Sequence, residues 1–105
     1  MKKKITALNL SEKKLEKKKI TALTAYDYFT ARVLDEAGID ILLVGDSLAH
    51  VFMGEANTFN VTVEQIAYHV KACSNAVNRA FLVADMPFLS YNLSASETLV
   101  NAGKF

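Results

Sequence analysis

The sequence is poor in the residues that mark several classes of protein. Its single cysteine, Cys73, allows no internal disulfide. No apolar run approaches the roughly 18 residues of a membrane-spanning helix, and the apolar stretch after the first lysines is too short for a secretion signal. No glycine-rich dinucleotide-binding loop is present. These absences argue against a disulfide-rich secreted domain and a helical membrane protein, and we expect a reducing, cytoplasmic setting.

Charge is distributed unevenly along the chain. The 105 residues are 51% hydrophobic and 22% charged, which predicts one small domain with a core. Residues 1–19 hold eight lysines against Glu12 and Glu16, whereas residues 20–105 hold four basic and nine acidic residues. The lysine-rich part lacks interleaved aromatics and any recognition motif, so we predict a solvated helical leader over 1–19, with no nucleic-acid or membrane partner.

The heptad KKKITAL occurs twice, at 2–8 and at 17–23. The first copy runs into Asn9-Leu10-Ser11-Glu12, which has the form of a capping box and predicts a helix from there to about Lys19. The second copy opens a β-branched stretch over 20–25, which predicts a strand. The residues after each copy therefore give it a different structure, and the pair is not a structural repeat.

Strand and helix signals alternate over the rest of the chain. Asp27 is a good cap for a helix that Gly38 ends, because glycine readily adopts the left-handed conformation. The further expected elements are a strand over 39–44, a long loop over 48–60 with a short helical turn, a helix opened by the capping box 62–65, a strand over 80–84 that Pro87 ends, and a helix from the capping box 94–97 to about 103.

This β-α-β-α-β-α order after residue 19 predicts a parallel α/β fold. Three strands are too few to close a barrel, so we predict the first three βα units of a (β/α)8 TIM barrel, a fold of typically about 250 residues, preceded by the N-terminal helix. An open three-layer sandwich is the alternative. The sequence stops within or just after a helix, and we expect residues 20–105 to be the N-terminal part of a single truncated barrel domain.

Each predicted strand ends in polar residues: Tyr26-Asp27, Asp46-Ser47 and Asp85. Asp27 is explained as a helix cap. Asp46 and Asp85 would project from neighbouring strands about 4.8 Å apart, so either one is protonated or a cation lies between them. Mg2+ suits such oxygen ligands. Ser47 is either a hydrogen-bond donor to an anionic substrate or an ordinary turn hydroxyl.

Four other side chains are weaker candidates. His50 lies in the loop after the second strand, where it either faces the site or is simply solvated. His69 and Cys73 share a helix, where a structural role is expected for the histidine and a core position for the cysteine. Tyr26 either lines the mouth of the site or packs beneath it, and the sequence does not separate these alternatives.

Four blocks of sequence, in this order and spacing, resemble the ketopantoate hydroxymethyltransferase family. The resemblance covers about residues 5–102. Its blocks are Ile20-Thr21-Ala22-Leu23-Thr24-Ala25-Tyr26-Asp27-Tyr28, Leu43-Val44-Gly45-Asp46-Ser47-Leu48, Val61-Thr62 through Ala67-Tyr68-His69, and Val83-Ala84-Asp85-Met86-Pro87-Phe88.

The resemblance implies a TIM barrel of the phosphoenolpyruvate/pyruvate type and a step of pantothenate biosynthesis. That step transfers a hydroxymethyl group from 5,10-methylenetetrahydrofolate to 3-methyl-2-oxobutanoate, giving 2-dehydropantoate. The residues matching Asp46 and Asp85 ligate Mg2+ in the family, and those matching Asp46, Ser47 and Asp85 contact the 2-oxo acid. The family forms homo-oligomers, typically decamers.

The base glutamate of the family, a substrate-binding lysine and a further metal-shell glutamate lie beyond these 105 residues, so we expect the segment alone to be inactive. Ala49-His50 stands where the family has Gly-Met, and Phe59-Asn60 where it has Leu-Pro. The lost proline is expected to loosen the start of the helix at Thr62. Two alternatives stay open: another Mg2+-dependent 2-oxo-acid lyase of the same superfamily, and a non-catalytic truncated fragment.

Overall fold

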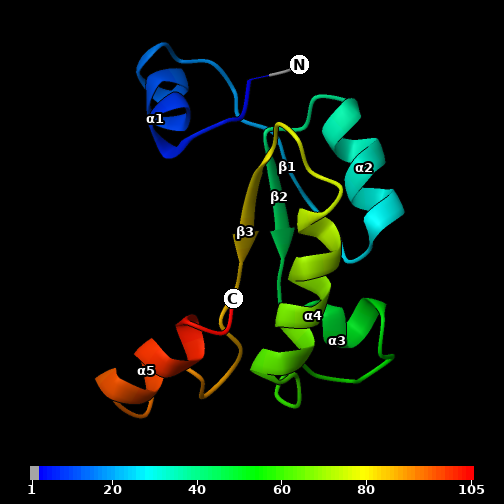
Figure 1. The fold of residues 1–105 in the computed structure, drawn as a ribbon, viewed down its shortest axis with the longest axis vertical. Helices are drawn as coiled ribbons and strands as arrows, with labels where there is room; N and C mark the ends of the chain where they lie inside the picture. The colour runs from blue at the N-terminus through cyan, green and yellow to red at the C-terminus, as the bar shows by residue number, and fades with distance from the viewer. Residues whose placement is uncertain (1–2) are drawn as a thin grey trace.

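The computed structural model describes residues 3–105, so Met1 and Lys2 of the expected leader lie outside it. Three parallel strands form one sheet in the order β1-β2-β3: β1 is Ala22–Thr24, β2 is Ile41–Val44 and β3 is Phe81–Ala84 (Figure 1). Leu42 pairs with Leu23 on one side and with Leu82 on the other. The predicted parallel α/β fold is confirmed.

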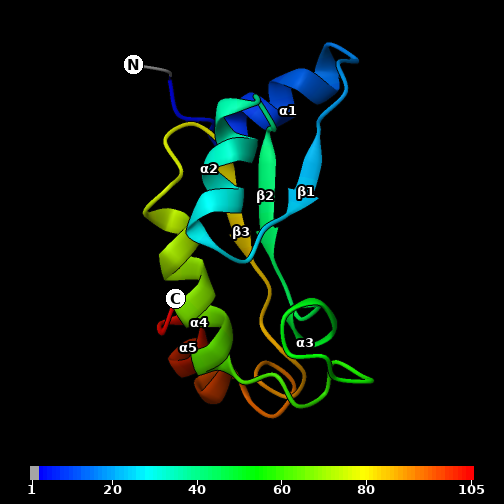
Figure 2. The same cartoon turned by 90° about the vertical axis from the view of Figure 1, so that its right-hand side faces the viewer.

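Two helices, α2 (Tyr28–Glu36) and α4 (Val63–Ser74), cover one face of this sheet (Figure 2). Leu42 and Val44 point into that layer and are fully buried with Ile66 and Cys73 of α4. Leu43 alternates to the opposite face, where it is only half-buried. The core therefore lies between the sheet and the two helices.

Local signals set the ends of these helices where the sequence predicted them. Asp27 caps α2 by accepting from the Thr30 N–H at 2.8 Å, and Gly38 has a φ of 92° just after its C-cap. Thr62 opens α4 with a complete capping box. The short turn expected in the long loop is α3 (Leu48–Val51), and Ser94 caps α5 (Ala95–Ala102). The helices α3 and α5 both lie toward the end of the molecule to which the strands point (Figure 1).

The helix in the leader, α1 (Ala7–Leu15), begins and ends earlier than predicted. Asn9 is not its N-cap. Thr6 caps it by accepting from the Asn9 N–H at 3.2 Å, while the Asn9 side chain accepts from the Thr6 N–H at 2.9 Å. Lys17, at φ 58°, is in the left-handed region and ends the helix before Lys19. The predicted bounds, from about residue 9 to 19, are therefore wrong.

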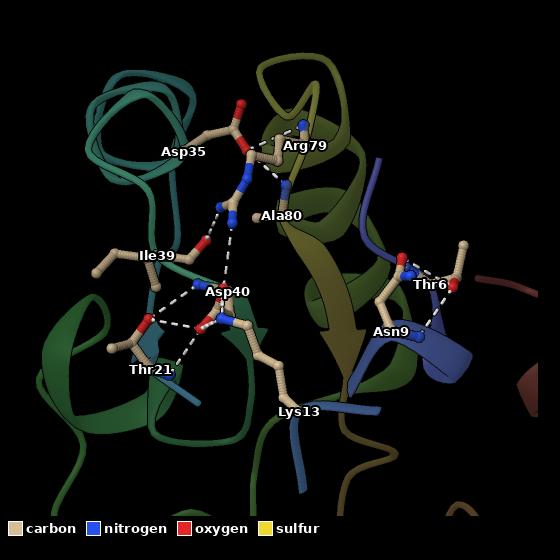
Figure 3. A network of polar contacts seen from close by, with 9 residues as sticks. All are labelled: Thr6, Asn9, Lys13, Thr21, Asp35, Ile39, Asp40, Arg79 and Ala80. Atoms are coloured by element: carbon tan, nitrogen blue, oxygen red, sulfur yellow. Dashed lines mark hydrogen bonds and ion pairs between the residues drawn. The ribbon is translucent and has the colours of Figure 1, made fainter. Parts of the chain in front are cut away.

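A buried carboxylate, Asp40, ties α1 to the sheet at the end where the strands begin (Figure 3). It accepts from the Lys13 ammonium at 2.9 Å, from the Thr21 N–H at 3.0 Å and from the Arg79 guanidinium at 3.3 Å. Burial alone would raise the pKa of Asp40, but the Thr21 N–H and Lys13 outweigh it and lower the pKa to about 2. Asp40 is therefore ionised and fully paired.

A second buried carboxylate, Asp35, joins the end of α2 to the segment that leads into β3 (Figure 3). It accepts from the backbone N–H groups of Asn78, Arg79 and Ala80 at 2.9, 3.1 and 2.6 Å. Burial alone would raise the pKa of Asp35, but the three N–H donors together lower it by a larger amount, so the net shift is downward. Both carboxylates lie at the end of the sheet opposite Asp46 and Asp85, where they stabilise the fold.

Candidate functional site

Asp46 and Asp85 lie at the carboxyl ends of the neighbouring strands β2 and β3. Val44 pairs with Ala84, and the Asp85 N–H donates to the Val44 carbonyl at 3.0 Å, so the sheet ladder continues up to the carboxylates. Both aspartates line one open pocket of about 430 Å3, together with Met86 and Tyr91. The structure thus brings together the two residues that the sequence predicts as a pair.

Gly45 leaves room for the carboxylate of Asp85. A Cβ atom at Gly45 would lie 2.6 Å from Asp85 Oδ2 and 3.6 Å from Leu43 Cγ. Because Gly45 alternates with the buried Val44, that Cβ direction points to the sheet face away from α2 and α4. Asp85 therefore folds over the Gly45 backbone on the face opposite these helices, and any larger residue at position 45 would displace its carboxylate.

Ser47 bonds to Tyr26 rather than capping the helix that begins after it. The Tyr26 hydroxyl is hydrogen-bonded to Ser47 Oγ, and the side chain of Ser47 makes no cap bond to α3. Both residues are half-buried and both come after a strand. The pocket is lined by Asp46, Asp85, Met86 and Tyr91, whereas Tyr26 packs against the core and contacts Ser47, the residue that follows Asp46.

The remaining candidates have structural partners. Asp27 is occupied as the cap of α2, and the exposed His50 bonds through Nδ1 to the carbonyl of Glu55 at 2.9 Å, within its own loop. His69 bonds to the backbone of Tyr26. Cys73 is fully buried, and burial, with a smaller contribution from the charge of Asp27, raises the pKa of its thiol to about 11. Cys73 is therefore a core residue, as predicted.

One part of the pocket was not predicted from the sequence. Tyr91 lines it from the loop after β3, and nothing in the local pattern around Tyr91 marks it as a site residue. Met86 also lines it, and its signal was available, since it comes directly after Asp85. The mouth of the pocket therefore depends on a loop whose path the sequence does not predict.

The donor set fits a hard divalent cation that keeps ligands from solvent and substrate. Within residues 3–105, no group of three or more His, Cys, Asp and Glu side chains could hold a metal ion by itself. Asp46 and Asp85 line the same pocket, and Mg2+ is commonly held by one or two carboxylates with water and substrate oxygens completing its shell. The two aspartates are thus the candidate metal ligands.

The positions that depart from the family pattern lie beside this region. The ring of Phe59 packs on Phe88 with centroids 4.9 Å apart, joining the loop before α4 to the loop after β3. Thr62 still forms both bonds of its capping box, so α4 starts at its predicted position without a proline before it.

None of the helices over residues 3–105 is long and apolar enough to span a bilayer.

A family model and individual relatives both match this chain, and all are described as hydroxymethyltransferases. The model of the ketopantoate hydroxymethyltransferase family matches residues 4–105. The 3-methyl-2-oxobutanoate hydroxymethyltransferase of Thermoanaerobacter sp. (strain X514) is 53% identical over 104 residues, which cover 99% of this chain and 38% of the relative. The protein of the same name from Koribacter versatilis is 50% identical over 102 residues, covering 97% of this chain and 35% of the relative. The chain thus spans little more than a third of the length of these relatives.

Proposed function

The chain belongs to the ketopantoate hydroxymethyltransferase family, and from this premise we propose that it supplies the 2-oxo-acid and metal-binding part of such an enzyme. The proposed reaction transfers a hydroxymethyl group from 5,10-methylenetetrahydrofolate to 3-methyl-2-oxobutanoate, giving 2-dehydropantoate. The names of the relatives support the acceptor and the group transferred. The folate donor is proposed on the resemblance of the sequence blocks.

The shared pocket of Asp46 and Asp85 is the observation that carries this proposal. The two carboxylates come after adjacent parallel strands, where α/β enzymes place their sites. Asp85 lies over Gly45, so its carboxylate has a defined place on the open face of the sheet. We propose Asp46 and Asp85 as the ligands of Mg2+, and Asp46, Ser47 and Asp85 as contacts of the 2-oxo acid.

The reaction requires a proton to leave the carbon next to the ketone of the substrate. When bound, Mg2+ draws electron density from the keto group and makes that neighbouring C–H bond more acidic. Asp46 and Asp85 hold the negative charge that attracts the ion, and the Ser47 hydroxyl donates a hydrogen bond to the carboxylate end of the substrate. Each of these side chains binds or orients, and none is proposed as the base.

The rest of the proposed enzyme lies in the part of the relatives that this chain does not match. The three parallel strands, with α2 and α4 on one face only, support a (β/α)8 barrel in which further strands continue the sheet. The general base is proposed to come from that remainder, since the chain covers 38% of the Thermoanaerobacter relative. A homo-oligomeric, cytoplasmic enzyme is proposed on the resemblance alone.

A chimera tests the proposal directly. In it, this chain replaces the matched 104-residue segment of the Thermoanaerobacter sp. relative. We expect the chimera to form 2-dehydropantoate from 3-methyl-2-oxobutanoate and 5,10-methylenetetrahydrofolate in the presence of Mg2+, and to lose this activity on chelation. A chimera that melts cooperatively yet transfers no hydroxymethyl group, at any Mg2+ concentration, would overturn the proposal.

A further inference from the structure

Tyr26 lies between β1 and the proposed substrate site, and its backbone is held on both sides. The N–H of Ala25 donates to the Leu43 carbonyl at 3.0 Å, so sheet pairing reaches the residue before Tyr26. The residue after it, Asp27, is fixed by its cap bond to the Thr30 N–H at 2.8 Å. The position of the Tyr26 backbone is therefore determined by the sheet and by α2 together.

A side chain of α4 holds the peptide group of Tyr26 itself. His69 Nδ1 lies 2.6 Å from the Tyr26 carbonyl oxygen, and since a carbonyl only accepts, Nδ1 is the protonated nitrogen and donates. The His69 ring is itself packed edge-on against Phe52 and Tyr68, with centroids 4.7 and 5.4 Å apart. This support fixes the peptide group from which the Tyr26 side chain projects.

The hydroxyl of Tyr26 meets Ser47 Oγ. Either hydroxyl could donate in this contact, and the greater acidity of the phenol favours Tyr26 as the donor and Ser47 as the acceptor. Ser47 then keeps its own proton for another acceptor. The Ser47 side chain makes no capping bond to α3. Ser47 directly follows Asp46, which lines the pocket.

We propose that Tyr26 is a positioning residue for the 2-oxo acid, acting through Ser47. Its hydroxyl holds the Ser47 side chain in one rotamer and leaves the Ser47 proton free to be donated to the carboxylate of the substrate. The inference rests on the proposed function, because it needs a 2-oxo acid at Ser47. Without Tyr26, the Ser47 hydroxyl would rotate among its staggered positions and would lose the partner that sets its polarity.

The test is a double-mutant cycle in the same chimera. Tyr26→Phe should raise KM for 3-methyl-2-oxobutanoate about 3- to 10-fold, the effect of one net hydrogen bond, with kcat changed less than about twofold. Ser47→Ala should raise KM at least as much. In the Ser47→Ala background, Tyr26→Phe should have no further effect, because the hydroxyl it acts on is gone. Tyr28→Phe, which removes the same hydroxyl from a tyrosine of α2 with a 39% exposed side chain, is the matched control and should leave both constants unchanged.

The outcomes separate this inference from the function on which it rests. If a chimera that carries the unaltered chain folds but is inactive, the proposed function is wrong. An active chimera in which Tyr26→Phe leaves KM unchanged, or raises KM equally with and without the Ser47 hydroxyl, overturns the role of Tyr26 while the function stands. If Tyr26→Phe fails to fold, 3-fluorotyrosine at position 26 keeps the hydroxyl and makes it a stronger donor. KM should then fall only when Ser47 is present, and an unchanged KM overturns the proposal.

Discussion

Replacing Gly45 by alanine tests the proposed site without removing any of its functional groups. The added Cβ would lie 2.6 Å from Asp85 Oδ2, against an ordinary contact of at least 3.4 Å, so the carboxylate must move by about 0.8 Å. The atom that gives way is the tip of an exposed side chain, and Gly45 does not lie in the left-handed backbone region. The fold should therefore tolerate the change, while the geometry of the site should not.

The displacement of the Asp85 carboxylate sets the size of the expected loss of activity. A misplacement of about 1 Å at a reacting centre lowers turnover by roughly 100-fold, and we expect Gly45→Ala to lower kcat/KM of the chimera by about that factor. The Mg2+ concentration for half-maximal activity should rise, since one ligand has left its place. The melting temperature should stay within about 4 °C of that of the unaltered chimera, corresponding to about 1 kcal/mol.

The assay measures initial rates of 2-dehydropantoate formation across a Mg2+ series, with thermal melts of the same samples. Gly103→Ala is the matched control, because a Cβ there would meet nothing closer than 3.4 Å and it lies at the end of α5. Gly103→Ala should leave rate and Mg2+ dependence unchanged. Full activity with an unaltered Mg2+ dependence in Gly45→Ala would refute the argument that Asp85 must lie over Gly45.

Three further predictions concern the fold. Asp40→Asn should lower the free energy of unfolding of the chimera by about 2 kcal/mol at neutral pH. The pKa of Asp40 is lowered to about 2 by folding, so its contribution is present above about pH 4 and is lost as the pH falls through 2; a difference that does not shrink in acid would contradict this. Thr62→Ala should cost about 1 kcal/mol in urea denaturation by removing the cap of α4, and an unchanged midpoint would count against it. Cys73, whose thiol pKa is raised to about 11, should react with iodoacetamide at pH 8 at least about 100-fold more slowly in the native than in the unfolded chimera, followed by mass spectrometry of its peptide, and rapid native labelling would contradict its burial.

Much of the fold could be predicted from local signals because those signals act over three or four residues. Asp27 and Thr62 cap helices through N–H groups three residues along, and Gly38 ends α2 through its own backbone conformation. The ends of the strands could be placed as well, because the strands lie between helices whose ends these signals mark. Because neighbouring parallel strands end at one edge of a sheet, the pairing of Asp46 and Asp85 in one pocket could be predicted as well.

The features that were missed depend on contacts between distant parts of the chain. Asn9 fits either the first or the fourth position of a capping box, and the local pattern does not decide between them. The N–H of Ile5, just before α1, donates to the Arg79 carbonyl at 2.7 Å, and Lys13 within it reaches Asp40. Both partners come from elsewhere in the sequence.

The same limit applies to the site. The bond from Tyr26 to Ser47 joins residues 21 positions apart, and Tyr91 reaches the pocket through an irregular loop. Neither has a periodicity or a spacing that a sequence pattern reveals. The placing of two carboxylates at neighbouring strand ends could therefore be predicted, whereas the residues around them required the structure.

Deuterium exchange at C3 of 3-methyl-2-oxobutanoate, followed by NMR in the absence of folate, reports whether Asp85 holds the metal that assists proton removal, because no later step contributes to it. The chimera should exchange this proton in a Mg2+-dependent manner, and Asp85→Asn should slow the exchange at least about 100-fold by removing a metal ligand. Asp27→Asn makes the same chemical change at the end of β1, where asparagine still caps α2, and should exchange at the unaltered rate. Exchange at the unaltered rate in Asp85→Asn would contradict the assignment of Asp85 to the metal site.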